Sequence, residues 1–156
     1  MLTRPLVVAI CLVTGIALAT VEGAIAAKPE CRTVHGRLDS VAADLDDNSA
    51  TLETVGTLRG GIHADFKFRG FSPIASGVLD NVQFYTATST YTLRDGSVVH
   101  GISTGVFDGM TGEVTEFTTF FAEDNLETEI GRIIVSGTFD LSAMVGKSRY
   151  RGHVCF

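Results

Sequence analysis

The segment IHADFKFR, residues 62–69, decides the fold because apolar and polar side chains alternate along it without interruption. Its apolar side chains all fall on one face of an extended chain: Ile62, Ala64, Phe66 and Phe68. Successive side chains of a β-strand point to opposite faces of the sheet. The period of two therefore predicts a strand with one buried face and one solvated face.

Two further segments show the same alternation. Residues 131–141 predict a strand whose inward side chains are Ile133, Val135, Phe139 and Leu141. Residues 83–93 place Thr86, Thr88, Thr90 and Thr92 on one face, among the aromatic residues that strands favour. No window long enough for a stable helix has the 3.6-residue period of an amphipathic helix. The chain is therefore predicted to be all-β.

Turn signals separate the predicted strands. The pair Asp95-Gly96 supplies the positive φ that a hairpin turn needs, and residues 108–112 and 142–147 form two more turns. Together these patterns predict about eight strands, near residues 31–41, 49–59, 61–71, 80–93, 97–107, 113–123, 131–141 and 147–156. Consecutive antiparallel strands in this number close into a barrel or stack as two sheets.

The cysteines favour the barrel. Cys31 begins the first predicted strand and Cys155 ends the last. The residues in phase with them are polar: Thr33, His35 and Arg37 in the first strand, and Arg149, Arg151 and His153 in the last. We therefore expect a disulfide on the outer wall that joins neighbouring first and last strands of a single antiparallel β-barrel. The alternative is two free or intermolecular cysteines.

The N-terminus resembles an export signal. Arg4 precedes an apolar run over residues 6–19, and Ala24-Ile25-Ala26 supplies the small residues of a cleavage site. We expect residues 1–26, with Cys11, to be removed after Ala26, or less favourably after Ala19; the alternative is an uncleaved anchor. Residues 27–156 would then form a single β-barrel domain, secreted or periplasmic, with no membrane attachment.

The charge balance excludes some partners. The chain has 12 Lys and Arg residues against 18 Asp and Glu residues, a net charge of −6, and no basic cluster. Phosphate binding needs a basic stripe, so the sequence argues against nucleic acid and against an anionic membrane surface. No nucleophile-elbow, phosphate-loop or dinucleotide motif is present, and we expect no cofactor. The sequence is compatible with either a monomer or a homo-oligomer.

A family resemblance becomes visible from Gly56 to the C-terminus. The segments that carry it are Gly56–Gly60, Thr92–Gly96, Phe107–Gly112, Gly131–Leu141 and Tyr150–Cys155. This part of the chain resembles small exported bacterial β-barrel proteins, which are similar to the barrel shared by allene oxide cyclase and dirigent proteins. The shared motifs are structural glycines and strand ends. The resemblance therefore implies a barrel fold and allows a cyclase activity, but it supplies no catalytic residue.

The sequence departs from these relatives before Gly131. Where they have a glycine-rich turn, residues 123–131 read EDNLETEIG, and only the last glycine remains. Any role in ligand binding or as a lid that the turn has in those proteins is therefore not transferred to this chain.

Candidate site residues follow from strand phase. His100 shares its phase with Val98 and Ile102 and could point into the interior as an acid, a base or a ligand contact, although Val99 makes the phase ambiguous. Glu116 lies in a strand that is apolar on both faces, so it is either a surface carboxylate or an inward proton donor with a raised pKa. Candidate ligand contacts are Tyr85, Tyr91, His100 and Phe120.

Metal motifs are weak. His35, His63 and His153 fall on polar phases, with no spacing typical of zinc ligands. Residues 44–49 begin like a calcium loop, but the loop glycine is missing and Val55 stands where a bidentate glutamate is needed. We therefore expect no metal.

Three functions are compatible with these patterns. The favoured one is a barrel whose lumen or mouth binds a small hydrophobic ligand. The second is a cyclase or isomerase that folds a hydrophobic substrate in the cavity. The third is a non-catalytic extracellular structural or surface-interaction protein, whose lumen would be filled by residues such as Phe66, Phe68, Phe120 and Phe139.

Overall fold

The computed structural model describes residues 30–45, 52–70, 75–76, 81–123 and 125–155. The predicted signal peptide and most of the calcium-like segment lie outside these residues. Besides turns, the described part contains strands and no helix: β1 (Cys31–Ala42), β2 (Glu53–Gly60), β3 (Ala64–Gly70), β4 (Ala75–Ser76), β5 (Val82–Leu93), β6 (Val98–Asp108), β7 (Glu113–Ala122), β8 (Asn125–Asp140) and β9 (Val145–Cys155). Within it, no helix is long and apolar enough to cross a membrane.

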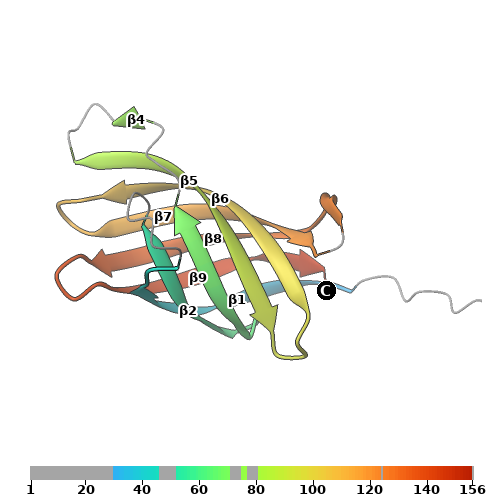
Figure 1. Cartoon of the computed structure of the whole chain (residues 1–156). Coiled ribbons are helices and arrows are strands. Elements are labelled where there is room, and N and C mark those ends of the chain that lie inside the picture. Colours follow the sequence, from blue (N-terminus) through green and yellow to red (C-terminus); the bar gives the residue numbers. More distant parts are fainter. Residues whose placement is uncertain (1–29, 46–51, 71–74, 77–80, 124, 156) are drawn as a thin grey trace, which may run out of the picture.

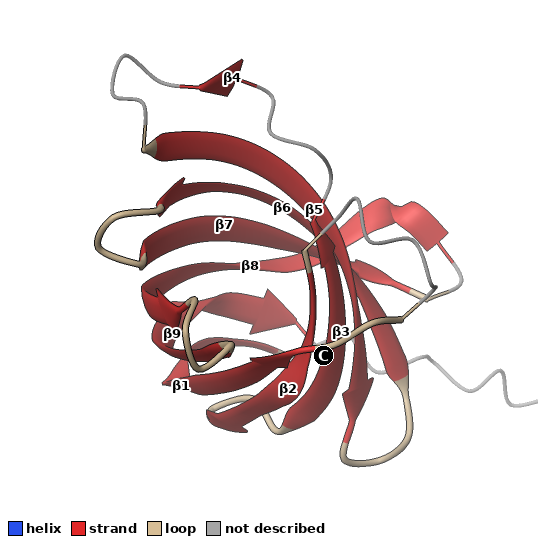
Figure 2. Cartoon of the chain, turned by 60° about the vertical axis from the view of Figure 1, so that its left-hand side comes forward, coloured by secondary structure: helices blue, strands red, loops and turns tan. Residues whose placement is uncertain are grey.

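Eight strands close into one antiparallel barrel. The sheet order is β3-β2-β1-β9-β8-β7-β6-β5, and β3 also pairs with β5, so the sheet returns to its first strand (Figure 1). The two-residue strand β4 pairs only with β5 and stays outside the closed ring. The strands curve around a common interior (Figure 2). The predicted all-β barrel is confirmed.

The disulfide is confirmed as well. Strands β1 and β9 are neighbours, and Cys31 and Cys155 are direct partners in their register. Their Cα atoms are 3.9 Å apart and their sulfur atoms are bonded. Cys31 is exposed and Val34, which has the opposite phase, is buried, so the bond lies on the outer wall.

The predicted alternation is confirmed in residues 62–69, where Ile62, Ala64 and Phe66 are buried and the polar side chains between them are exposed. One inward assignment is wrong. Leu141 is 50% exposed, because β8 ends at Asp140 and the chain turns there. The Asp140 carboxylate accepts hydrogen bonds from the amides of Ser142 and Ala143, which holds this turn.

Several strand boundaries also differ from expectation, and two of these differences have a clear cause. Strand β8 begins at Asn125, inside the segment where the sequence suggests a turn, and its pairing with β7 shifts register near Phe121. Strand β3 begins at Ala64 because the amide of Ile62 donates to the hydroxyl of Tyr150, 2.7 Å away, instead of to a neighbouring strand. Isolated sequence patterns do not show such partners.

The lumen has two unlike halves. At the end where β1 begins and β9 ends, side chains pack into a hydrophobic core, and its fully buried apolar members include Val34, Leu58, Phe120, Ile133 and Val154. We call this the filled half. At the opposite end, where β1 ends and β9 begins, the lumen contains a cavity, and this cavity is the place to look for a site.

Candidate functional site

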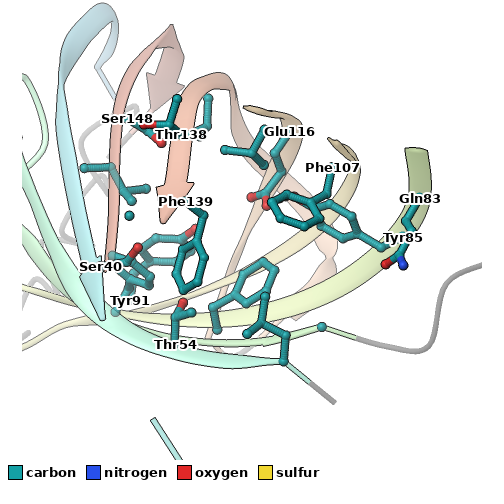
Figure 3. Close-up of a pocket in the computed structure, with 18 residues that line it drawn as sticks. Ser40, Thr54, Gln83, Tyr85, Tyr91, Phe107, Glu116, Thr138, Phe139 and Ser148 are labelled. Atoms are coloured by element: carbon teal, nitrogen blue, oxygen red, sulfur yellow. The ribbon is translucent and has the colours of Figure 1, made fainter. Parts of the chain in front are cut away.

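The lumen cavity has a volume of about 280 Å³. This is close to the lower limit of about 300 Å³ for typical ligand pockets. Aromatic rings form much of its wall: Phe66, Phe68, Tyr85, Tyr91, Phe107 and Phe139. Its polar lining is Ser40, Thr54, Gln83, Glu116, Thr138 and Ser148 (Figure 3). Phe66, Phe68 and Phe139 thus line this half of the lumen without filling it.

Glu116 supplies the only charged side chain among the residues that line the cavity. It lies on β7 and is 8% exposed. Of the two positions that the sequence allows for this residue, the structure has the inward one. Its neighbours explain how an acid is tolerated there.

Three hydroxyl groups surround the Glu116 carboxyl. The hydroxyls of Ser103 and Thr118 donate to Oε1 over 2.9 Å and 2.8 Å, and the hydroxyl of Tyr85 donates to Oε2 over 2.8 Å. The hydroxyl oxygens of Ser103 and Thr118 are also within hydrogen-bond distance of each other, at 3.0 Å. Hydrogen bonds of this kind offset much of the cost of burying a polar group.

The number of hydrogens favours a protonated carboxyl. The network has four close oxygen pairs but only three hydroxyl hydrogens when Glu116 is ionised. A proton on Oε1 of Glu116 is donated to Ser103, whose own hydrogen can then be donated to Thr118, so that all four pairs share a hydrogen. Burial acts in the same direction and raises the pKa of Glu116, although the hydrogen bonds from Thr118, Tyr85 and Ser103 oppose this effect.

Strand register brings Tyr85 to Glu116. Tyr85 on β5 is the partner of Gly105 on β6, and Gly105 is in turn the partner of Glu116 on β7. A Cβ at Gly105 would lie 2.3 Å from Cζ of Tyr85, so only a glycine leaves room for the ring to cross β6. Burial and the adjacent Glu116 raise the pKa of Tyr85, which keeps its hydroxyl a hydrogen-bond donor.

Tyr91 forms the boundary with the filled half. Its ring lies edge-on to Phe120 with centroids 5.0 Å apart, and burial raises the pKa of its hydroxyl. Tyr85 and Tyr91 both line the cavity, whereas Phe120 is 1% exposed and does not. Phe120 is therefore a core residue that packs behind the cavity wall and does not itself line the cavity.

Of the orientations that the sequence leaves open for His100, the structure has the outward one, so its candidate role in the lumen is wrong. Val99 and Ser103 are 4% and 0% exposed, whereas Ile102 is 51% exposed, so the other phase of β6 faces the lumen. His100 shares its phase with Ile102 and lies on the outer wall. The inward polar side chain of β6 is that of Ser103, which is 0% exposed.

The three other histidines, His35, His63 and His153, are exposed. Within the described residues, one group of possible metal ligands comes together: Cys31, His153 and Cys155, with ligand atoms within 4.8 Å of one another. The two sulfur atoms are bonded to each other and are not available as thiolates. The three residues therefore lie together because His153 is next to the disulfide, and they are not a set of available metal ligands.

Sequence reasoning missed Ser103, Gly105 and Thr118. Ser103 and Thr118 are both 0% exposed, and they are register partners on β6 and β7. Small hydroxyl residues on an inward face are a weak signal of a polar network. They become informative only once the register places them next to a buried acid.

Comparisons with known proteins give no match to a family model, to a curated protein or to a solved structure. The resemblance to the allene oxide cyclase and dirigent barrel therefore stays a prediction, and function has to be argued from the cavity itself.

Proposed function

We propose that the protein binds a small, largely apolar molecule in the lumen cavity. The observation that carries this proposal is a cavity of about 280 Å³ whose wall is mainly aromatic and contains one buried carboxyl group. Ligand pockets typically combine an apolar wall with a few placed polar groups. A purely structural barrel would be expected to fill this half of the lumen as it fills the other.

The test is binding of a neutral apolar fluorophore, N-phenyl-1-naphthylamine. Ser148 lines the cavity, so Ser148→Phe places a ring inside it. The matched control is Ser136→Phe, at an exposed position of the adjacent strand β8. We expect saturable binding by the wild type and the control, and its loss in Ser148→Phe.

Two results would contradict the proposal. Absence of binding by the folded wild type would favour the structural role. Equal binding by all three proteins would place the fluorophore outside the lumen. Mass analysis of the protein released from cells under denaturing conditions adds an independent test, because a retained natural ligand would appear as a second species.

A second candidate function is a cyclase or isomerase. Glu116 favours it, because a carboxyl that retains its proton beside an apolar cavity can act as a general acid. The resemblance to allene oxide cyclase is consistent with such an activity. In that case Glu116→Gln would abolish turnover of a substrate while leaving its binding intact, whereas a binding protein would show no turnover in either form.

We also propose that the protein functions after export, in the periplasm or outside the cell. The disulfide supports this, because such bonds persist in oxidising compartments. The N-terminal sequence of the protein recovered from cell fractions is the test. We expect it to begin after Ala26, and recovery of the intact chain from the cytoplasm would contradict the proposal.

A further inference from the structure

The lumen cavity contains an acidic group without a basic partner. Glu116 is its one acidic side chain, and no lysine, arginine or histidine is among the residues that line it. Within the described residues, the hydrogen-bond partners of Glu116 are all neutral hydroxyls. An anionic ligand would therefore enter a site that offers it no cation and places a carboxyl group beside it.

The Glu116 carboxyl also has an unused acceptor position. Each carboxylate oxygen can accept about two hydrogen bonds. Oε1 receives two, from Ser103 and Thr118, whereas Oε2 receives one, from Tyr85. Of the two oxygens, Oε2 is thus the one that can accept a hydrogen bond from a ligand.

Aromatic rings lie around this position. The rings of Phe68 and Tyr85 pack edge-on with centroids 6.2 Å apart, and Phe107 lines the same cavity. Figure 3 shows Phe107 and Tyr85 beside Glu116. Aromatic faces attract cations as well as apolar groups, so these rings suit an ammonium group that is attached to a hydrocarbon body.

We infer that the ligand is an amphiphilic amine. When its ammonium group binds, Glu116 releases its proton to solvent and Oε2 of the resulting carboxylate accepts a hydrogen bond from the ammonium, while the apolar body of the ligand lies against the aromatic wall. This inference rests on the proposed binding function and specifies its ligand class. A buried carboxylate paired with a hydrogen-bonded cation costs far less than an isolated one, so the ligand completes the network of the site. Fatty acids, which have similar apolar bodies, are disfavoured because their head group is anionic.

Three probes with the same hydrocarbon chain test the inference: octylamine, octanol and octanoate, titrated into the full mature protein by calorimetry at pH 7 and below their aggregation concentrations. We expect octylamine to bind about tenfold more tightly than octanol, as a charged hydrogen bond implies, and octanoate to bind most weakly. Glu116→Gln should remove the preference for octylamine. Glu113→Gln, an exposed position on the same strand, should retain it.

The outcomes separate the two proposals. Octanol binding as tightly as octylamine, or octanoate binding most tightly, overturns the amine inference and leaves lumen binding intact. Failure of all three probes and of the neutral fluorophore overturns lumen binding itself. If Glu116→Gln does not fold, the order of the three probes on the wild type still decides the inference. If it folds and keeps the preference, the inference is wrong.

Discussion

The ring of Tyr85 lies across the lumen face of β6, directly over Gly105. A Cβ built on Gly105 would lie 2.3 Å from Cζ and 2.4 Å from the hydroxyl oxygen of Tyr85. The two residues are register partners on β5 and β6, and the tyrosine hydroxyl reaches Glu116 on the next strand. The absence of a side chain at one position thus allows a hydrogen bond between residues two strands apart.

The first prediction concerns this glycine. Gly105→Ala should displace the Tyr85 ring, break its hydrogen bond to Glu116 and lower the free energy of unfolding by about 1–3 kcal/mol, as overpacking generally does. Urea denaturation measures the change. Gly109→Ala is the control, since the nearest atom to its added Cβ is 3.5 Å away. Equal stability of both variants would mean that the Tyr85 ring moves without cost.

The second prediction concerns pH. Burial raises the pKa of Glu116 above its ordinary value of 4.5, so the folded protein holds a proton that the unfolded chain releases. The free energy of unfolding contributed by this residue is therefore fully present below pH 4.5 and decreases as pH rises toward the folded-state pKa. Glu116→Gln cannot titrate and lacks this decrease.

Urea denaturation of the wild type and Glu116→Gln from pH 4 to pH 8 measures the effect. We expect the stability of the wild type relative to the variant to fall as pH increases. Glu113→Gln, which is exposed, controls for the loss of one negative charge. A relative stability that rises with pH would show that the hydroxyl network stabilises the ionised form instead.

The third prediction concerns the disulfide between Cys31 and Cys155, which are separated by 124 positions in the chain. Cross-linking a loop of this length restricts the unfolded chain, and the chain-entropy model gives about 4–5 kcal/mol of stabilisation. A Cys31→Ser, Cys155→Ser double variant should lose about this amount in denaturant unfolding. Reductant should destabilise the wild type similarly and leave the variant unchanged. Intact mass before and after reduction checks that the bond is present.

The fourth prediction concerns Tyr150. Its hydroxyl accepts a hydrogen bond from the amide of Ile62 over 2.7 Å and donates to the carbonyl of Ile62 over 3.1 Å. Tyr150→Phe leaves both buried groups without this partner and should cost about 1–3 kcal/mol of stability. Amide hydrogen exchange should accelerate at Ile62 more than at Leu58, which lies within β2. Unchanged exchange at Ile62 would show that another group replaces the hydroxyl.

The fold could be predicted well because its main signals are local. Alternation at residues 62–69 and turns at Gly96 and Gly112, both with positive φ, depend on short segments of chain. Errors occurred where a distant partner decides the structure. Strand β8 extends back to Asn125 because β7 pairs with it through a shifted register, which its own sequence does not reveal.

The candidate site could be predicted only in part. Tyr85 and Tyr91 line the cavity as expected of ligand contacts, and Glu116 faces inward, but His100 lies on the outer wall. Strand β6 has apolar side chains on both faces, including Val99 and Ile102, so hydrophobicity alone cannot say which face is inside. Contact with the other strands removes this ambiguity.

The sequence by itself determined that this chain forms an antiparallel barrel with Cys31 and Cys155 on its outer face, because strand periodicity and the phase of each side chain are properties of adjacent residues. The pairing register determined the rest. It placed Gly105 between Tyr85 and Glu116, and it gathered bulky side chains in one half of the lumen while leaving a cavity in the other. These features depend on which residues of separate strands lie opposite one another, and that is a property of the closed barrel.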